Sequence, residues 1–397
     1  MSNALKPIAR LLRASSIGVL LVALAACGGG GGGSSSAPPP TQSPPAPAPT
    51  PDPTPDPDPD PDPDPEPVPV EAAVALEQLV DDVIIAGAES FQTDAQGLLA
   101  GAESFCASGS TDLAELQSGW EGLMERWFFL ANYVFGPLND NIVSPVFYFI
   151  DSLRLRGTDY TETVRAVIAE DISSDQVLND EFFAGKTFQR VGLLALEVAL
   201  FETATGERSQ DLAMITAEYG NTPRKCEVLI GLARQLTQQA DYVVDGWLIQ
   251  HRNATEPYRT LFLAGETDDG TEPMAQLIIA IQEHLEYLQS RRVVEVAAQL
   301  SQHNWDAVSA GVDGAEAYLE GAGEDSVSFF DVMIENGETA VVDEVRGTLA
   351  AIREAIDLQD PAILEVRLGQ LDGNFKREIA DALGVELGIN FSDGDGS

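Results

Sequence analysis

Apolar residues recur at intervals of three and four along most of the chain after residue 70. This spacing places apolar side chains on one face of an α-helix, and the strict alternation typical of half-buried strands is hardly seen. The clearest runs are Leu76, Leu79, Val80, Val83, Ile84; Leu229, Leu232, Leu236, Val243, Trp247; Met274, Leu277, Ile278, Ile281, Leu285, Leu288; and Val341, Val345, Leu349, Ile352, Ile356. We therefore predict an all-α body over residues 71–390. About 320 helical residues exceed one simple four-helix bundle, so we expect two packed helical-bundle halves, roughly 71–220 and 221–390.

The first 26 residues predict an export signal that ends at a lipidated cysteine. Lys6, Arg10 and Arg13 precede an uncharged apolar run from Ser15 to Ala26, which is too short to span a bilayer. Small residues lead into Cys27 in a pattern that resembles a bacterial lipobox. We expect lipid on Cys27 to hold the chain at a membrane. An ordinary secretory signal with an incidental cysteine is the alternative.

Residues 27–70 predict a disordered tether rich in glycine, serine, proline and aspartate. Prolines favour the polyproline II conformation and the like-charged aspartates between Pro51 and Pro65 resist collapse. Such a segment spans on the order of 100 Å and would keep the body clear of the membrane. Gly28 follows the cysteine, where aspartate commonly retains lipoproteins in the inner membrane. We therefore expect the outer membrane of the cell envelope, facing the periplasm.

The formal net charge of −42 limits the partners of the chain. So much negative charge repels nucleic acid and anionic lipid, so no nucleic-acid partner is expected, and it attracts cations or a basic partner. A solvated surface adapted to a salty environment explains the charge equally well.

The body contains two cysteines, Cys106 and Cys226. An even pair in an exported body predicts one disulfide, which would stabilise the fold by about 4 to 5 kcal/mol in the chain-entropy model. Two free buried thiols are the alternative.

Familiar catalytic signatures do not occur in this sequence. No segment resembles a phosphate-binding loop, a dinucleotide fingerprint, a nucleophile elbow or a zinc-binding HExxH motif. The three histidines, His251, His284 and His303, are dispersed. His303 and Asp306 could share a helix face, where a solvated pair or a helix-start contact is expected rather than a metal site.

Two apolar segments stand out as candidates for function. In Trp120–Pro137, large apolar groups including Trp127 share one helix face, and Gly136-Pro137 ends the helix. Core packing alone would explain this segment.

The second segment, Gly192–Phe201, places Glu197 on an apolar stripe. A carboxylate there must find a hydrogen-bond donor or a cation, or keep its proton. We expect Glu197 to be buried and paired with a basic or hydroxyl group, and Arg126 and Arg190 are the candidate cations. A structural ion pair and a functional carboxylate both remain open.

Four pieces in order carry a family resemblance: Phe105-Cys106, the Trp120–Pro137 segment, GLLALEVALF from Gly192, and Arg224-Lys225-Cys226 before a long helix. Together they resemble the imelysin-like proteins, exported and often lipid-anchored bacterial proteins also classed as M75 peptidases. The resemblance covers most of residues 72–385 and thins after about residue 300. It implies an all-helical fold of two bundle-like halves with a functional site between them.

The signature of that family site is GxHxxE. Gly192 and Glu197 match it, but Leu194 occupies the histidine position. Leucine neither ligates a metal nor moves a proton, so no catalytic residue is assigned. The resemblance therefore favours a non-catalytic binding lipoprotein linked to the acquisition of iron or another divalent metal. An M75-type peptidase and a structural or adaptor protein that binds an envelope partner are the alternatives.

Overall fold

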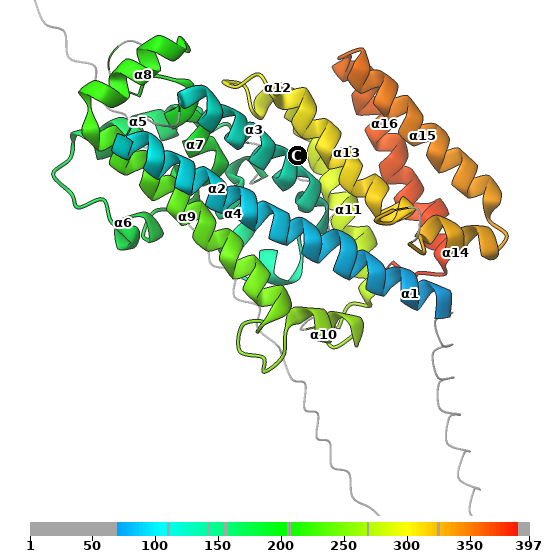
Figure 1. Ribbon diagram of the computed structural model, residues 1–397. Coiled ribbons are helices and arrows are strands. Elements are labelled where there is room, and N and C mark those ends of the chain that lie inside the picture. Colours follow the sequence, from blue (N-terminus) through cyan, green and yellow to red (C-terminus); the bar gives the residue numbers. More distant parts are fainter. Residues whose placement is uncertain are drawn as a thin grey trace, which may run out of the picture. The chain divides into compact units, whose positions relative to one another are not determined.

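The computed structural model describes most of the chain after the predicted tether, and every regular element in the described part is helical (Figure 1). The all-α prediction is confirmed. The predicted signal peptide, Cys27 and the tether up to residue 69 lie outside the described residues. Within the described part, no helix combines the length and the apolar character needed to cross a membrane. The described residues are 70–108, 112–141, 143–154, 158–204, 206, 208–267, 270–323 and 326–387.

The first group of helices assembles around α2 (Ala86–Ser108) and α9 (Pro223–Leu248). These two helices pack along each other, and α3 (Leu113–Leu130) packs against α2 on a different side (Figure 1). A shorter helix, α7 (Gly192–Phe201), packs against both α3 and α9. The smaller elements of this group are α1 (Val70–Gln78), a π-helical turn (Leu79–Ile85), α4 (Val146–Ile150), α5 (Thr161–Ser173), α6 (Asp180–Ala184), α8 (Leu212–Asn221) and α10 (Tyr258–Leu263).

The second group contains α11 (Pro273–Ser290), α13 (Asn304–Glu320), and the antiparallel pair α15 (Thr339–Asp357) and α16 (Pro361–Asn374). Helix α16 packs on α11, and α13 packs on α3, so α13 joins the two groups. The apolar run from Met274 to Leu288 lies within α11, and the run from Val341 to Ile356 lies within α15. The helices predicted from these two runs are therefore confirmed. The remaining elements are α12 (Val293–Val296), α14 (Phe329–Glu335), a π-helical turn (Phe375–Ile379) and α17 (Ala380–Leu383).

One continuous apolar core runs through both groups. Its largest fully buried side chains include Trp120, Trp127, Trp247 and Tyr318, which come from both groups of helices. Because the core is continuous, the two groups of helices form one compact unit. The boundaries proposed from the sequence, at residues 71 and 390 and near residue 220, stay predictions.

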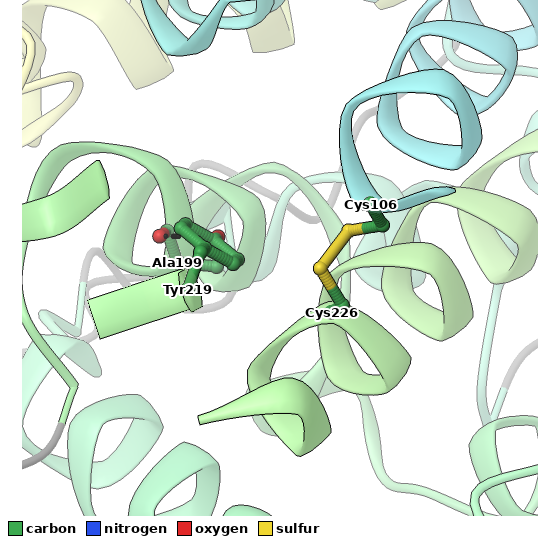
Figure 2. Close-up of a disulfide and its surroundings, with 4 residues drawn as sticks. All are labelled: Cys106, Ala199, Tyr219 and Cys226. Carbon is green, nitrogen blue, oxygen red and sulfur yellow. Dashed lines mark hydrogen bonds between the residues drawn. A yellow bond between two sulfur atoms is a disulfide. The ribbon is translucent and has the colours of Figure 1, made fainter. Parts of the chain in front are cut away.

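The predicted disulfide is confirmed (Figure 2). Cys106 near the end of α2 is bonded to Cys226 in the first turn of α9, with their Cα atoms 5.7 Å apart. Beside the bond, the Tyr219 hydroxyl of α8 donates a hydrogen bond of 2.8 Å to the carbonyl oxygen of Ala199 in α7. The disulfide therefore fixes the start of α9 to α2 next to the point where α7 and α8 meet.

Candidate functional site

Helix α7 begins at a glycine because no other residue fits there. Gly192 has a φ of +81°, and a Cβ atom on it would lie 2.5 Å from the carbonyl oxygens of Phe149 and Ile150. The next residue, Leu193, accepts a hydrogen bond of 3.1 Å from the indole N–H of buried Trp120. The Gly192 of the motif and the Trp120 of the earlier segment therefore position the same helix turn.

Leu194 is partly buried and packs against the apolar core. It stands where the family motif has histidine. Its side chain offers no atom to a metal ion or a proton, so this position contributes packing alone.

Glu197 is 2% exposed, and its carboxylate is held by main-chain and hydroxyl donors from the other group of helices. One oxygen, Oε1, accepts hydrogen bonds from the backbone N–H of Leu300 (3.0 Å) and of Ser301 (3.1 Å). The Ser301 hydroxyl lies 3.1 Å from the same oxygen. Burial and a hydroxyl partner agree with the expectation from the sequence.

The expected arginine partners of Glu197 are wrong. Arg126 forms a surface ion pair with Asp94 at 3.4 Å, and its side chain is 59% exposed. Arg190, in the 3-10 turn before α7, is also exposed. The physical reason is desolvation: a buried guanidinium would itself lose hydration, whereas backbone N–H groups of a turn are donors that must be satisfied in any case.

The turn that Glu197 holds is strained. Two residues in the turn between α12 and α13 that are not glycine have left-handed backbone angles: Ala298 (φ +48°) and Gln302 (φ +61°). Such conformations cost on the order of 1–3 kcal/mol each and persist where surrounding contacts determine them. The Glu197 carboxylate supplies such contacts, so it joins α7 to the segment that precedes α13.

Burial raises the pKa of Glu197 from its ordinary value of 4.5 to about 7. The hydrogen bonds from Ser301 and Leu300 oppose this effect, because they stabilise the ionised carboxylate. The loss of hydration is the larger influence, so Glu197 changes its protonation state near neutral pH.

A second contact joins the segment before α13 to α3. His303 Nε2 lies 2.7 Å from a carboxylate oxygen of Glu125 on α3, and its Nδ1 lies 3.4 Å from Asp306. The sequence indicated the pairing with Asp306 but not the one with Glu125, which is 178 positions away in the chain. No periodicity within one helix could have revealed it.

Trp127 lies in a different buried cluster, around Asp151. The Trp127 indole N–H donates to Asp151 Oδ2 at 3.2 Å, and the Tyr287 hydroxyl donates to the same oxygen at 3.1 Å. The sequence placed Trp127 on an apolar helix face but did not indicate Asp151. Asp151 follows the short helix α4 and belongs to no recognisable motif.

Gly136 and Pro137 pack on α10 and α9 rather than on α7. Gly136 has a φ of +51°, and a Cβ atom there would lie 2.3 Å from the Tyr258 ring. Pro137 packs so closely on Gly246 of α9 that a Cβ atom on that glycine would lie 2.7 Å from it. This part of the Trp120–Pro137 segment therefore shapes another region of the molecule.

The residues around α7 do not fit a metal ion. Glu197 is engaged by three donors and Leu194 has no ligand atom. Across the described ranges, no group of three or more histidine, cysteine, aspartate or glutamate side chains is arranged to hold a metal. The iron or other divalent metal implied by the resemblance therefore has no evident ligand set in that part of the chain.

The family of the chain is shown by its sequence. The model of the imelysin family, peptidase M75, matches residues 84–385. The chain belongs to the imelysin family. No curated protein matches its sequence.

The fold of this imelysin-family chain is similar to two crystal structures. One is an imelysin-like protein from Psychrobacter arcticum 273-4, with a TM-score of 0.64 and 15% identity over 81% of this chain and 98% of that chain. The other, from Parabacteroides distasonis ATCC 8503, is named as a proposed iron-regulated protein A precursor, with a TM-score of 0.55 and 15% identity over 80% and 94%. At this identity the likeness shows the fold alone.

Proposed function

We propose that this imelysin-family chain is a non-catalytic binding protein of the cell envelope. The observation that carries the proposal is that the family motif GxHxxE is incomplete and its glutamate is already hydrogen-bonded within the protein. Leu194 replaces its histidine, and the carboxylate of Glu197 is engaged by the backbone of Leu300 and Ser301. A carboxylate that holds its own protein together is poorly placed to activate water or bind a substrate.

The link to iron is proposed to run through a chelated ligand or a partner protein. The name of the Parabacteroides distasonis structure supports an iron connection, and the poor fit of the α7 residues to a metal argues against direct ligation. Lipid on Cys27 would hold the chain in the outer membrane, facing the periplasm. Repulsion between the acidic body and anionic lipid would favour an extended tether.

An M75-type peptidase is the second candidate, and one observation favours it. A carboxylate whose pKa is about 7 is in the range that suits a general base. A hydrolase of this kind would need Glu197 to leave Leu300 and Ser301 and face a substrate.

A melting screen and a peptidase assay separate these functions. The screen compares ferric siderophores, haem and free metal ions, and a ligand at 100 times its Kd should stabilise the fold by about 2.7 kcal/mol. We expect stabilisation by a chelate or an organic ligand rather than by free ions. Peptide cleavage that is lost in Glu197→Gln and kept in Glu125→Gln would instead establish the peptidase. A stoichiometric envelope partner captured without any ligand would favour the adaptor.

A further inference from the structure

Residues 297–303, which connect α12 to α13, form a strap that is tied to the first group of helices by polar contacts. The backbone N–H groups of Leu300 and Ser301 donate to Glu197 Oε1 of α7 at 3.0 and 3.1 Å. The carbonyl oxygen of Leu300 accepts a hydrogen bond of 3.2 Å from Gln210 Nε2, just before α8. The strap therefore belongs in sequence to one group of helices and is held by side chains of the other.

The last residue of the strap, His303, is tied to α3. Its Nε2 lies 2.7 Å from a carboxylate oxygen of Glu125, and its Nδ1 lies 3.4 Å from Asp306 of α13. Figure 1 shows α13 running beside α3, with the strap entering α13 at its first turn. A single side chain thus links the end of the strap to both of these helices.

The strap has little apolar anchorage of its own. Ala297 and Ala298 are buried but small, and Leu300 is only partly buried, while Gln299 and Gln302 are exposed. Ala298 and Gln302 also carry the left-handed backbone angles described above. Segments with few buried apolar contacts are those that open locally while the rest of a fold stays intact. The polar contacts are therefore what keep this segment closed.

We propose that the strap is a pH-dependent cover of the motif glutamate, closed at acidic pH and opening locally as the pH rises. The open state is a minor one whose population the pH sets. This regulation applies to a binding protein and to a peptidase alike, because opening frees Glu197 from the backbone donors that engage it. It does not rest on the proposed function.

Glu197 gives the pH dependence its direction. The donors that surround it in the closed strap are uncharged, and burial raises its pKa from 4.5 to about 7. In the open strap the carboxylate returns to water and to its ordinary pKa. The open state therefore releases the proton more readily, so opening becomes more favourable as pH rises from 4.5 to about 7 and changes little above that.

His303 acts in the same direction. Histidine is the side chain whose charge changes between about pH 5 and 8. Its contacts with Glu125 and Asp306 are ion pairs only while the imidazole is protonated. A rise in pH removes this attraction and loosens the end of the strap.

Other buried charges near α7 do not reverse these effects. They are paired with one another: Glu202 with Arg165, Glu218 with Lys225, and Asp171 with Lys186. Glu202, at the end of α7, raises the pKa of Glu197 further. Its influence therefore adds to that of burial.

The test is hydrogen exchange of the purified full chain, measured by mass spectrometry and corrected for intrinsic exchange rates. Peptides that cover the strap should exchange faster than those of α9 at every pH, and their opening constant should rise at least about tenfold between about pH 5.5 and 8. Glu197→Gln should remove most of this rise, whereas Glu335→Gln on α14 should leave it unchanged. Glu125→Gln, at a half-exposed position, should speed exchange of the strap at the acidic end and not at the alkaline end.

Two results would overturn the proposal. Exchange of the strap at the same rate as α9 would show that it opens only when the whole fold unfolds. A rise with pH that is identical in wild type, Glu197→Gln and Glu125→Gln would show that neither contact controls it. Neither result bears on the proposed binding function, which the melting screen tests separately.

Discussion

Replacing Glu197 by glutamine tests what its buried carboxylate does to the fold. Glutamine keeps the size of the side chain and an oxygen that can accept from Leu300 and Ser301, but it never ionises. Burial raises the pKa of Glu197 from 4.5 to about 7 in the folded chain. The variant therefore removes one titration and little else.

The direction of the effect follows from proton binding. Between pH 4.5 and about 7 the folded chain keeps a proton on Glu197 that the unfolded chain has released. The free energy of unfolding therefore falls as pH rises through this window. The stabilisation from the protonated Glu197 is fully present below pH 4.5 and is lost above about pH 7. At 1.36 kcal/mol for each pH unit, the whole change amounts to about 3 kcal/mol.

Urea unfolding of both proteins across pH 4.5 to 8 measures this change. We expect the two to have similar stability at the acidic end. At the alkaline end, the free energy of unfolding of the Glu197→Gln variant should exceed that of the wild type by about 3 kcal/mol. Glu335→Gln, at an exposed position on α14, is the control and should show no such trend. If the free energies of unfolding of Glu197→Gln and wild type differ by the same amount at every pH, the argument from burial is refuted.

Three further predictions concern the scaffold. Cys106→Ser with Cys226→Ser should lower the free energy of unfolding by about 5 kcal/mol in urea titrations, since the bond closes a loop of 120 residues, and a loss below about 1 kcal/mol would contradict this. Gly136→Ala should lower the melting temperature because of its φ of +51° and the nearby Tyr258 ring, whereas Gly122→Ala on open helix surface should not. Lys225→Met should cost about 3 to 5 kcal/mol in chemical unfolding, because the fully buried ammonium pairs with a carboxylate of α8, and an unchanged midpoint would show that the pair contributes nothing.

The sequence predicted those features that depend on local spacing. The run from Leu229 to Trp247 lies within α9, and the run from Met274 to Leu288 lies within α11. The disulfide followed from an even count of cysteines in an exported body. The burial of Glu197 followed from its place on an apolar stripe.

The partners of these residues could not be predicted, because they depend on packing between distant segments. Ser301 is 104 positions from Glu197, and a strained backbone turn presents its N–H groups. The buried ion pair of Lys225 with Glu218 lies beside the disulfide, and nothing in the spacing of either residue distinguishes it from a surface charge. The position of the Tyr258 ring likewise depends on a contact with Gly136 that only the folded chain brings about.

Metal retention tests the central claim that Glu197 holds the protein backbone rather than a metal or a substrate. The purified full chain and its Glu197→Gln variant are dialysed to equilibrium against Fe(II), Fe(III) and Zn(II), and the bound metal is measured. The account predicts that both proteins retain the same amount of each metal. One equivalent of iron or zinc retained by the wild type and lost by the Glu197→Gln variant would contradict it.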